Sequence, residues 1–110
     1  MKKTKMDLLK GTLELIVLRI LQTGPANGWG VIQKIKEDSQ DILSVSSGSV
    51  YPALYRLEAK GWIKAEWRAS ENNRSARFYR LTALGRKQLD NERQSWEEVS
   101  TAVNLILRKA

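Results

Sequence analysis

The chain has 110 residues, which is enough for one small domain with a modest core, alone or with an appendage. Its 19 Lys and Arg outnumber its 12 Asp and Glu, and the net charge of +7 favours a polyanionic partner over a merely basic soluble surface. It contains no cysteine and no histidine. Disulfides, thiolate or imidazole metal sites and Cys- or His-based nucleophiles are therefore excluded.

The N-terminal segment is basic, but it does not read as a targeting or membrane segment. The apolar run that follows it is interrupted by Gly11, Glu14 and Arg19, and no small-residue cleavage site is present. We therefore expect neither a signal peptide nor a membrane span, and a cytoplasmic location.

Two helices are expected in the first 40 residues. The range Leu8 to Gln22 carries a wide apolar stripe, and the Thr23-Gly24-Pro25 cluster ends it. A second helix is expected to start after an Asn27 cap and to fade between Glu37 and Gln40. Its inward-facing side chains are expected to be Trp29, Ile32 and Ile35.

A third helix is expected from Ser46 to Gly61, and its two faces differ in chemistry. Val50, Leu54 and Leu57 recur at helical spacing and form an inward stripe. The opposite face is small, aromatic and cationic, and it collects Gly48, Ser49, Pro52, Tyr55, Arg56 and Ala59. Pro52 is expected within or just after the first turn, where a missing N–H costs least.

A basic β-hairpin is expected directly after this helix. The ranges Trp62 to Arg68 and Arg77 to Leu81 alternate in polarity, and a polar tip from Ala69 to Ala76 joins them. Between Lys60 and Arg80 six basic residues face two acidic ones, so the hairpin is strongly positive. We expect Trp62 and Trp67, like Trp29 before them, to pack in the core or on the hairpin.

A final helix is expected to begin at a Thr82 cap and to reach almost to the C-terminus. Five residues follow heptad spacing along it: Leu89, Trp96, Val99, Val103 and Ile106. Such a helix would extend about 40 Å and would protrude from a small head, so its apolar stripe needs another surface. A second copy of the chain is the simplest candidate, and folding back onto the first helix is the alternative.

A helix followed at once by a basic hairpin indicates winged helix-turn-helix binding to double-stranded DNA. Arg56 suits a guanine or a phosphate, and the wing arginines suit phosphate or the minor groove. Tyr51 either reads a base or packs against the second helix. The candidate DNA contacts are Lys3, Lys5, Ser47, Gly48, Ser49, Tyr51, Pro52, Tyr55, Arg56, Arg74 and Arg77.

The expected fold is mainly α with a small antiparallel β-hairpin: a winged helix-turn-helix over residues 1–82 and a dimerisation helix over residues 83–110. The carboxylates lie mainly on solvated helix faces and no Gly-rich phosphate loop is present, so we expect no enzyme, metal or cofactor. A winged-helix module for RNA or protein is the competing hypothesis. Trp96, central in the heptad stripe, either packs at the interface or stacks a flat, apolar or cationic effector.

The chain resembles the PadR family of bacterial transcriptional regulators over nearly its full length. The matching motifs are Leu9-Lys10-Gly11-Thr12-Leu13-Glu14, the YPxLxxLExxG run from Tyr51 to Gly61, and Tyr79-Arg80-Leu81-Thr82 with Gly85. The range from Trp62 to Trp67 and the single C-terminal helix are similar to the short PadR-type subgroup. One departure is Asn27-Gly28-Trp29, where the family often has His-Gly-Tyr.

The resemblance implies a homodimeric winged-helix repressor, acting on a pseudo-palindromic operator at the bacterial nucleoid. It places the interface on the C-terminal helices, and Trp96 matches the position at which an interface tryptophan stacks the ligand in drug-binding relatives. The missing histidine puts in doubt any effector or pH response that depends on it.

Overall fold

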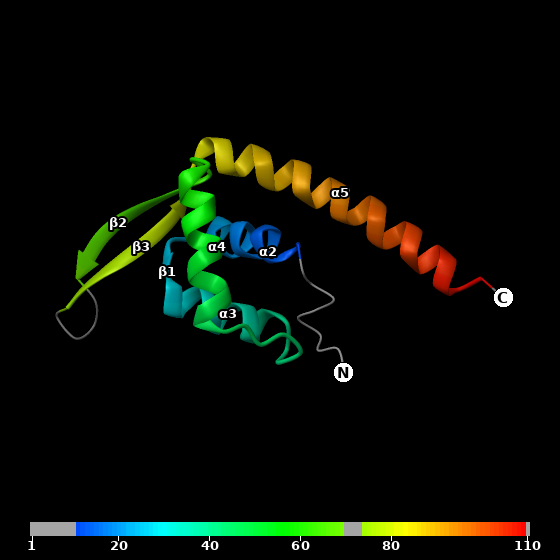
Figure 1. Ribbon diagram of the computed structural model, residues 1–110, viewed down its shortest axis with the longest axis horizontal. Helices are drawn as coiled ribbons and strands as arrows, with labels where there is room; N and C mark the ends of the chain where they lie inside the picture. Colours follow the sequence, from blue (N-terminus) through cyan, green and yellow to red (C-terminus); the bar gives the residue numbers. More distant parts are fainter. Residues whose placement is uncertain (1–10, 70–73, 110) are drawn as a thin grey trace.

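The computed structural model describes residues 11–69 and 74–109, and these form a helical head, a small sheet and a long C-terminal helix that projects from the head (Figure 1). The molecule measures 58 × 32 × 22 Å. In chain order the elements are α2 (Leu13–Gln22), β1 (Ala26–Asn27), α3 (Gly28–Asp38), α4 (Ser47–Ala59), β2 (Ile63–Ala69), β3 (Ser75–Leu81) and α5 (Ala83–Leu107).

The mainly α fold with an antiparallel hairpin is confirmed. None of the helices in the described ranges combines the length and the apolar character needed to cross a membrane. The predicted helix from Leu8 begins, within the described residues, at Leu13, and its earlier part lies outside them.

Helix α2 is the centre of the head, since it contacts α3, α4, α5 and β3. All the buried side chains among the described residues are apolar, apart from Tyr79 with its phenolic hydroxyl. The predicted inward stripe of α4 is confirmed, because Val50, Leu54 and Leu57 are fully buried. The core is therefore one apolar cluster around α2.

Local capping bonds fix where the helices begin and end. The Gly30 N–H donates to Asn27 Oδ1 at 2.7 Å, and the Gly85 N–H donates to Thr82 Oγ1 at 3.0 Å, so both predicted caps are confirmed. At the end of α4, Gly61 has φ +76° and its N–H donates to the Glu58 carbonyl, while the Trp62 N–H donates to the Leu57 carbonyl. This pair of bonds is a Schellman motif, which turns the chain sharply into the wing.

Pro52 lies deeper in α4 than predicted. It is the sixth residue of the helix, in the second turn, because α4 starts at Ser47. A proline there removes the N–H that would bond to the Gly48 carbonyl. Gly48 itself lies in the exposed, N-terminal half of α4.

The sheet has three strands in the order β1-β3-β2, one more than predicted. The hairpin register runs from Ile63 opposite Leu81 to Ala69 opposite Ser75, so the strands reach further toward the tip than the alternation indicated. The extra strand pairs Ala26 with Tyr79. Two residues after a proline carry no alternating pattern, which is why β1 was not predicted.

Two of the tryptophans are exposed. Trp29 is 65% exposed, so its expected inward position was wrong; Trp67 is 69% exposed on β2, so it belongs to the hairpin and not to the core. In the first turn of α3 the buried residue is Gly28, against which the Tyr51 ring packs. Along β2 burial falls from Ile63 at the base to Ala69 at the tip, because the hairpin projects beyond the core.

Helix α5 belongs to the head at its start and leaves it further on (Figure 1). Leu89 is fully buried in the core of its own chain, beside α2. Its assignment to a dimer stripe is therefore corrected: the first turns of α5 fold onto the head, as the alternative reading expected. From Trp96 onward the apolar side chains remain exposed.

Gly85→Ala is expected to destabilise the fold by about 3 kcal/mol, because a Cβ there would overlap the Trp62 carbonyl. Two hydrogen bonds from Thr82 hold that carbonyl in place. Gly48→Ala is the matched control, since only Ser46 Oγ lies near, at 3.6 Å, and it should be neutral or stabilising by up to about 1 kcal/mol. Urea unfolding of both variants measures the difference; equal midpoints would contradict the expectation.

Candidate nucleic-acid interface

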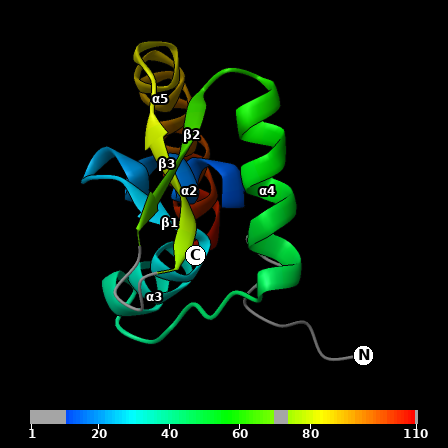
Figure 2. The same ribbon diagram turned by 90° about the vertical axis from the view of Figure 1, so that its left-hand side faces the viewer.

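Helix α4 and the β2–β3 hairpin stand side by side at one end of the molecule (Figure 2). The predicted outward face of α4 is exposed, and its first turn contains no carboxylate. The exposed candidate residues on α4 are Ser47, Gly48, Ser49, Tyr51, Pro52, Tyr55 and Arg56. The positive end of the helix dipole and small side chains therefore occupy the part of α4 that is open to a partner.

Tyr51 packs against α3, which is one of the two roles weighed for it. Its ring packs so closely on Gly28 of α3 that any Cβ at that position would overlap it. Yet Tyr51 is 49% exposed, so part of the side chain remains open beside Ser47 and Ser49. Gly28 is thus required by a close approach between α3 and α4.

Glu14 of α2 bridges to two cations, Arg56 in α4 and Lys60 at the C-cap of α4. Arg56 Nε donates to Glu14 Oε1 at 2.9 Å, and Lys60 Nζ donates to Glu14 Oε2 at 3.2 Å. Partial burial raises the pKa of the Glu14 carboxyl, but the hydrogen bonds and charges of Arg56 and Lys60 outweigh this effect. The pKa of Glu14 is therefore lowered from its usual value of 4.5. Lys60 Nζ also lies 4.6 Å from the centre of the Trp62 ring.

A second ion pair ties the wing to α4. Arg77 of β3 donates to Glu58 Oε2 at 2.7 Å, and its guanidinium lies over the Tyr79 ring. Burial raises the pKa of the Tyr79 phenol above 10.0. Arg77 is one of the predicted DNA contacts, and in the structure its guanidinium links the hairpin to α4.

The outer face of the hairpin carries further cations. Arg68 is paired with Glu66 and lies over the Phe78 ring. Lys64 and Arg80 are directly opposite each other in the register, and both are exposed. Like-charged pairs across strands are destabilising, so this pair suits a surface that receives an anion. Among residues 11–69 and 74–109 no carboxylate pairs with Lys64, Arg74 or Arg80.

The remaining predicted contacts divide into two groups. Arg74 is exposed and immediately precedes β3. Lys3 and Lys5 lie outside the described residues. The predicted set of DNA contacts did not include Lys60, Trp29 or Trp67, which are also exposed. The sequence did not indicate that the two tryptophans are on the surface, because apolar side chains are expected in the core.

A separate surface is formed by the part of α5 that leaves the head. Trp96, Val99, Val103 and Ile106 follow the predicted stripe, and their exposed fractions range from 44% to 72%. Leu107 extends this apolar surface toward the C-terminus. An exposed apolar surface of this length is typical of a protein interface.

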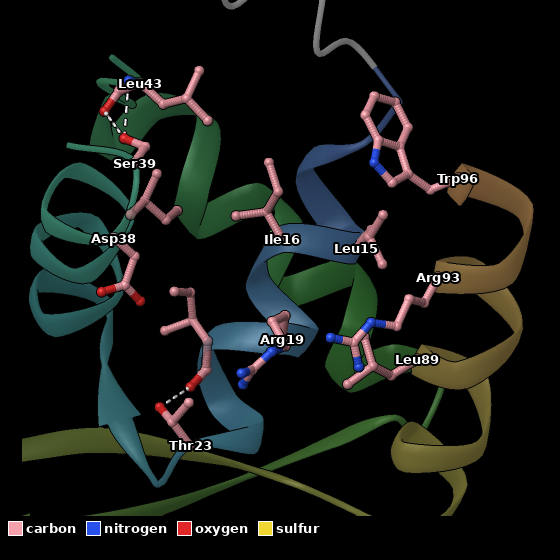
Figure 3. Close-up of a pocket in the computed structure, with 12 residues that line it drawn as sticks. Leu15, Ile16, Arg19, Thr23, Asp38, Ser39, Leu43, Leu89, Arg93 and Trp96 are labelled. Carbon is pink, nitrogen blue, oxygen red and sulfur yellow. Dashed lines mark hydrogen bonds between the residues drawn. The ribbon is translucent and has the colours of Figure 1, made fainter. Parts of the chain in front are cut away.

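Trp96 also borders a pocket of about 400 Å³ between α2, α5 and the end of α3 (Figure 3). Leu15, Ile16 and Leu89 supply apolar wall, while Arg19 projects from α2 and Arg93 from α5. Asp38 lines the opposite side, on α3. A second hollow of about 270 Å³ shares Leu15 and Trp96 with the first.

A family model described as the transcriptional regulator PadR-like family matches residues 17–91. The chain belongs to this family. PadR-like proteins regulate transcription and are not enzymes, in agreement with the prediction. The matched range covers α3, α4, the hairpin and the start of α5, whereas Glu14 and the apolar part of α5 from Trp96 onward lie outside it.

Relatives agree with this assignment to the PadR-like family. Transcriptional regulator Rv3488 of Mycobacterium tuberculosis is 42% identical over 68 residues, which cover 62% of this chain and 63% of that protein. A crystal structure of a PadR-like transcriptional regulator from Bacillus cereus is 33% identical, with a TM-score of 0.81, and the match covers 94% of this chain and 99% of that one.

One similar structure contains nucleic acid. It is Bacillus subtilis PadR in complex with operator DNA, with a TM-score of 0.65 and 24% identity. The match covers 73% of this PadR-like chain and 46% of that chain. At this identity the likeness establishes the winged-helix fold.

The Glu14 bridge is expected to make stability depend on pH. Because the folded pKa is below the unfolded one, the stabilisation is fully present above the unfolded pKa near 4.5 and is lost as pH falls through the folded value. The free energy of unfolding of wild type should exceed that of Glu14→Gln by up to about 1 kcal/mol near pH 7, and this difference should shrink at about pH 3. Urea unfolding across this range measures it; parallel profiles would contradict it.

Proposed function

We propose that this PadR-like chain binds a pseudo-palindromic operator in double-stranded DNA as a homodimer and represses transcription. The observation that carries the proposal is the exposed, carboxylate-free N-terminal half of α4 beside a basic wing. The fold shared with Bacillus subtilis PadR, solved with operator DNA, supports it. A DNA-bound repressor acts at the chromosome, so we place it in the bacterial cytoplasm, associated with the nucleoid.

In this proposal α4 enters the major groove and the wing contacts the backbone or minor groove. Ser47, Gly48 and Ser49 permit close approach and donate or accept hydrogen bonds, while Pro52 and Tyr55 offer apolar contact. Arg56, Arg74 and Arg77 contact phosphates or bases. Tyr51 contributes with its exposed part, and Lys3 and Lys5 add phosphate contacts from the N-terminal arm.

The dimer is proposed to form through α5. Residues 1–82 then make the DNA-binding unit and residues 83–110 the dimerisation helix, whose first turns also complete the core of the head through Leu89. The apolar stripe from Trp96 to Ile106 would be covered by its symmetry mate. Two such heads can present their α4 helices to major grooves about one helical turn apart.

An effector is a second proposal, carried by the pocket at Trp96 (Figure 3). The apolar walls and the indole suit a flat molecule. Of the apolar and cationic effectors considered, the apolar one is favoured, because Arg19 and Arg93 together outweigh the single carboxylate of Asp38 among the lining residues. The test is the quenching of tryptophan fluorescence by flat dyes in wild type and in Trp96→Ala. Identical quenching in the two proteins argues against this pocket as the effector site.

RNA or protein is the alternative partner of the basic face. Competition between duplex DNA and structured RNA at fixed salt separates the two, since a DNA regulator is displaced by excess duplex and not by an equal amount of RNA. Preferential displacement by RNA would overturn the proposal.

Arg74→Ala is expected to weaken DNA binding three- to tenfold and to reduce the salt slope by about one, with no change in site preference. Arg56→Ala should weaken binding as well. Lys109→Ala, which removes the same charge beyond the end of α5, is the control and should leave affinity nearly unchanged. Fluorescence anisotropy on a duplex selected from genomic fragments measures these effects; unchanged affinity in both arginine variants would overturn the assignment.

Val103→Asp is expected to convert the dimer to a monomer, because it places a charge in the centre of the apolar stripe. Thr101→Asp adds the same charge to the opposite side of α5 and should leave the dimer intact. Sedimentation equilibrium distinguishes the two variants. A dimer that survives Val103→Asp unchanged would show that the interface lies elsewhere.

A further inference from the structure

Glu14 occupies an unusual position for an acidic residue in a basic DNA-binding surface. It lies in the first turn of α2, and both of its carboxylate oxygens are used by α4, one by Arg56 and the other by Lys60. Arg56 and Lys60 are four residues apart on the same helix, so they are neighbours that repel each other. One carboxylate placed between them removes this repulsion.

The arrangement leaves the cations outside and the carboxylate beneath them. The side chains of Arg56 and Lys60 are 54% and 45% exposed, whereas that of Glu14 is 26% exposed. Glu14 contacts Arg56 through Nε, and the two Nη groups make no hydrogen bond within residues 11–69 and 74–109. The trio carries a net charge of +1, and its guanidinium retains N–H donors that Glu14 does not use.

This geometry distinguishes two roles for Glu14. A carboxylate that blocked DNA binding would cover the cations and compete with phosphate for the same donors. Here the carboxylate is less exposed than either cation, so it restrains both side chains and leaves part of each open to solvent. Ordered donors are needed where a contact sets register, because phosphate contacts fix the orientation of a protein on the duplex.

We propose that Glu14 is a positioning residue for DNA binding, which aligns Arg56 and Lys60 into a clamp for one backbone phosphate beside α4. The inference rests on the proposed function and names a residue outside the predicted contact set. Without the Glu14 carboxylate, Arg56 and Lys60 still attract DNA through their charge, but their side chains are not held in one direction and do not fix the register of α4 on the duplex. Glu14 thus contributes to the preference for one sequence more than to affinity for DNA in general.

The test compares wild type with Glu14→Gln on two duplexes of equal length: one selected by wild type from a random pool, the other scrambled. Glu14→Gln is expected to reduce the preference for the selected duplex about fivefold, while scrambled-duplex binding stays equal or tightens. The salt slope on the scrambled duplex should stay equal or steepen. Glu37→Gln removes the same charge from an exposed site on α3 and should leave the preference unchanged.

A second background separates positioning from a general effect on the fold. When Arg56 and Lys60 are both replaced by Ala, adding Glu14→Gln should have no further effect on preference. The positioning role would be overturned if Glu14→Gln left the preference for the selected duplex intact. It would also be overturned if Glu14→Gln lowered that preference by the same factor in the Arg56→Ala, Lys60→Ala background as in wild type. A stronger preference in Glu14→Gln would overturn it as well, because Glu14 would then block the cations. If wild type selects no duplex, the proposed function itself fails.

Discussion

The burial of α2 is the constraint on which the rest of the structure depends. This ten-residue helix contacts α3, α4, α5 and β3, and it supplies Val17, Leu18, Ile20 and Leu21 to the core. The surrounding elements are therefore positioned mainly by the apolar face that each turns toward α2. The apolar contact fixes how close the elements lie, but it is not directional and does not orient what they present outward.

Orientation comes from the polar contacts around the rim of this core. Glu14 joins α2 to α4, and Glu58 joins α4 to β3 through Arg77, so α4 is tied to its neighbours on both sides. The Schellman turn at Gly61 and the Thr82 cap then set the directions in which the wing and α5 leave the head. The surface proposed to bind DNA is therefore shaped by groups that are only partly buried.

Periodicity and capping chemistry made most of the fold predictable. The Val50, Leu54 and Leu57 stripe, the Asn27 and Thr82 caps and the hairpin are local patterns, and each is found in the structure. Leu89 was placed on the wrong surface because a heptad pattern does not say where a helix leaves its own head. Trp29 was misplaced since hydrophobicity does not show how far a core extends.

The candidate site was predictable in outline and not in its ion pairs. The outward face of α4 follows from the inward stripe, because the two are opposite on one helix. The Glu14 bridge spans 42 residues to Arg56 and depends on how α2 crosses α4. Nothing in the local sequence marks that crossing, so Glu14 was read as an interruption of an apolar run.

The absence of histidine and cysteine from the chain acquires a further meaning beside these ion pairs. The pKa of Glu14 is shifted down and that of Tyr79 is shifted up, so both move away from neutrality. No side-chain type that normally titrates between pH 5 and 8 is present. The surface proposed to meet a polyanion therefore contains no imidazole or thiol through which pH could act, whereas ionic strength acts directly on its exposed cations by screening.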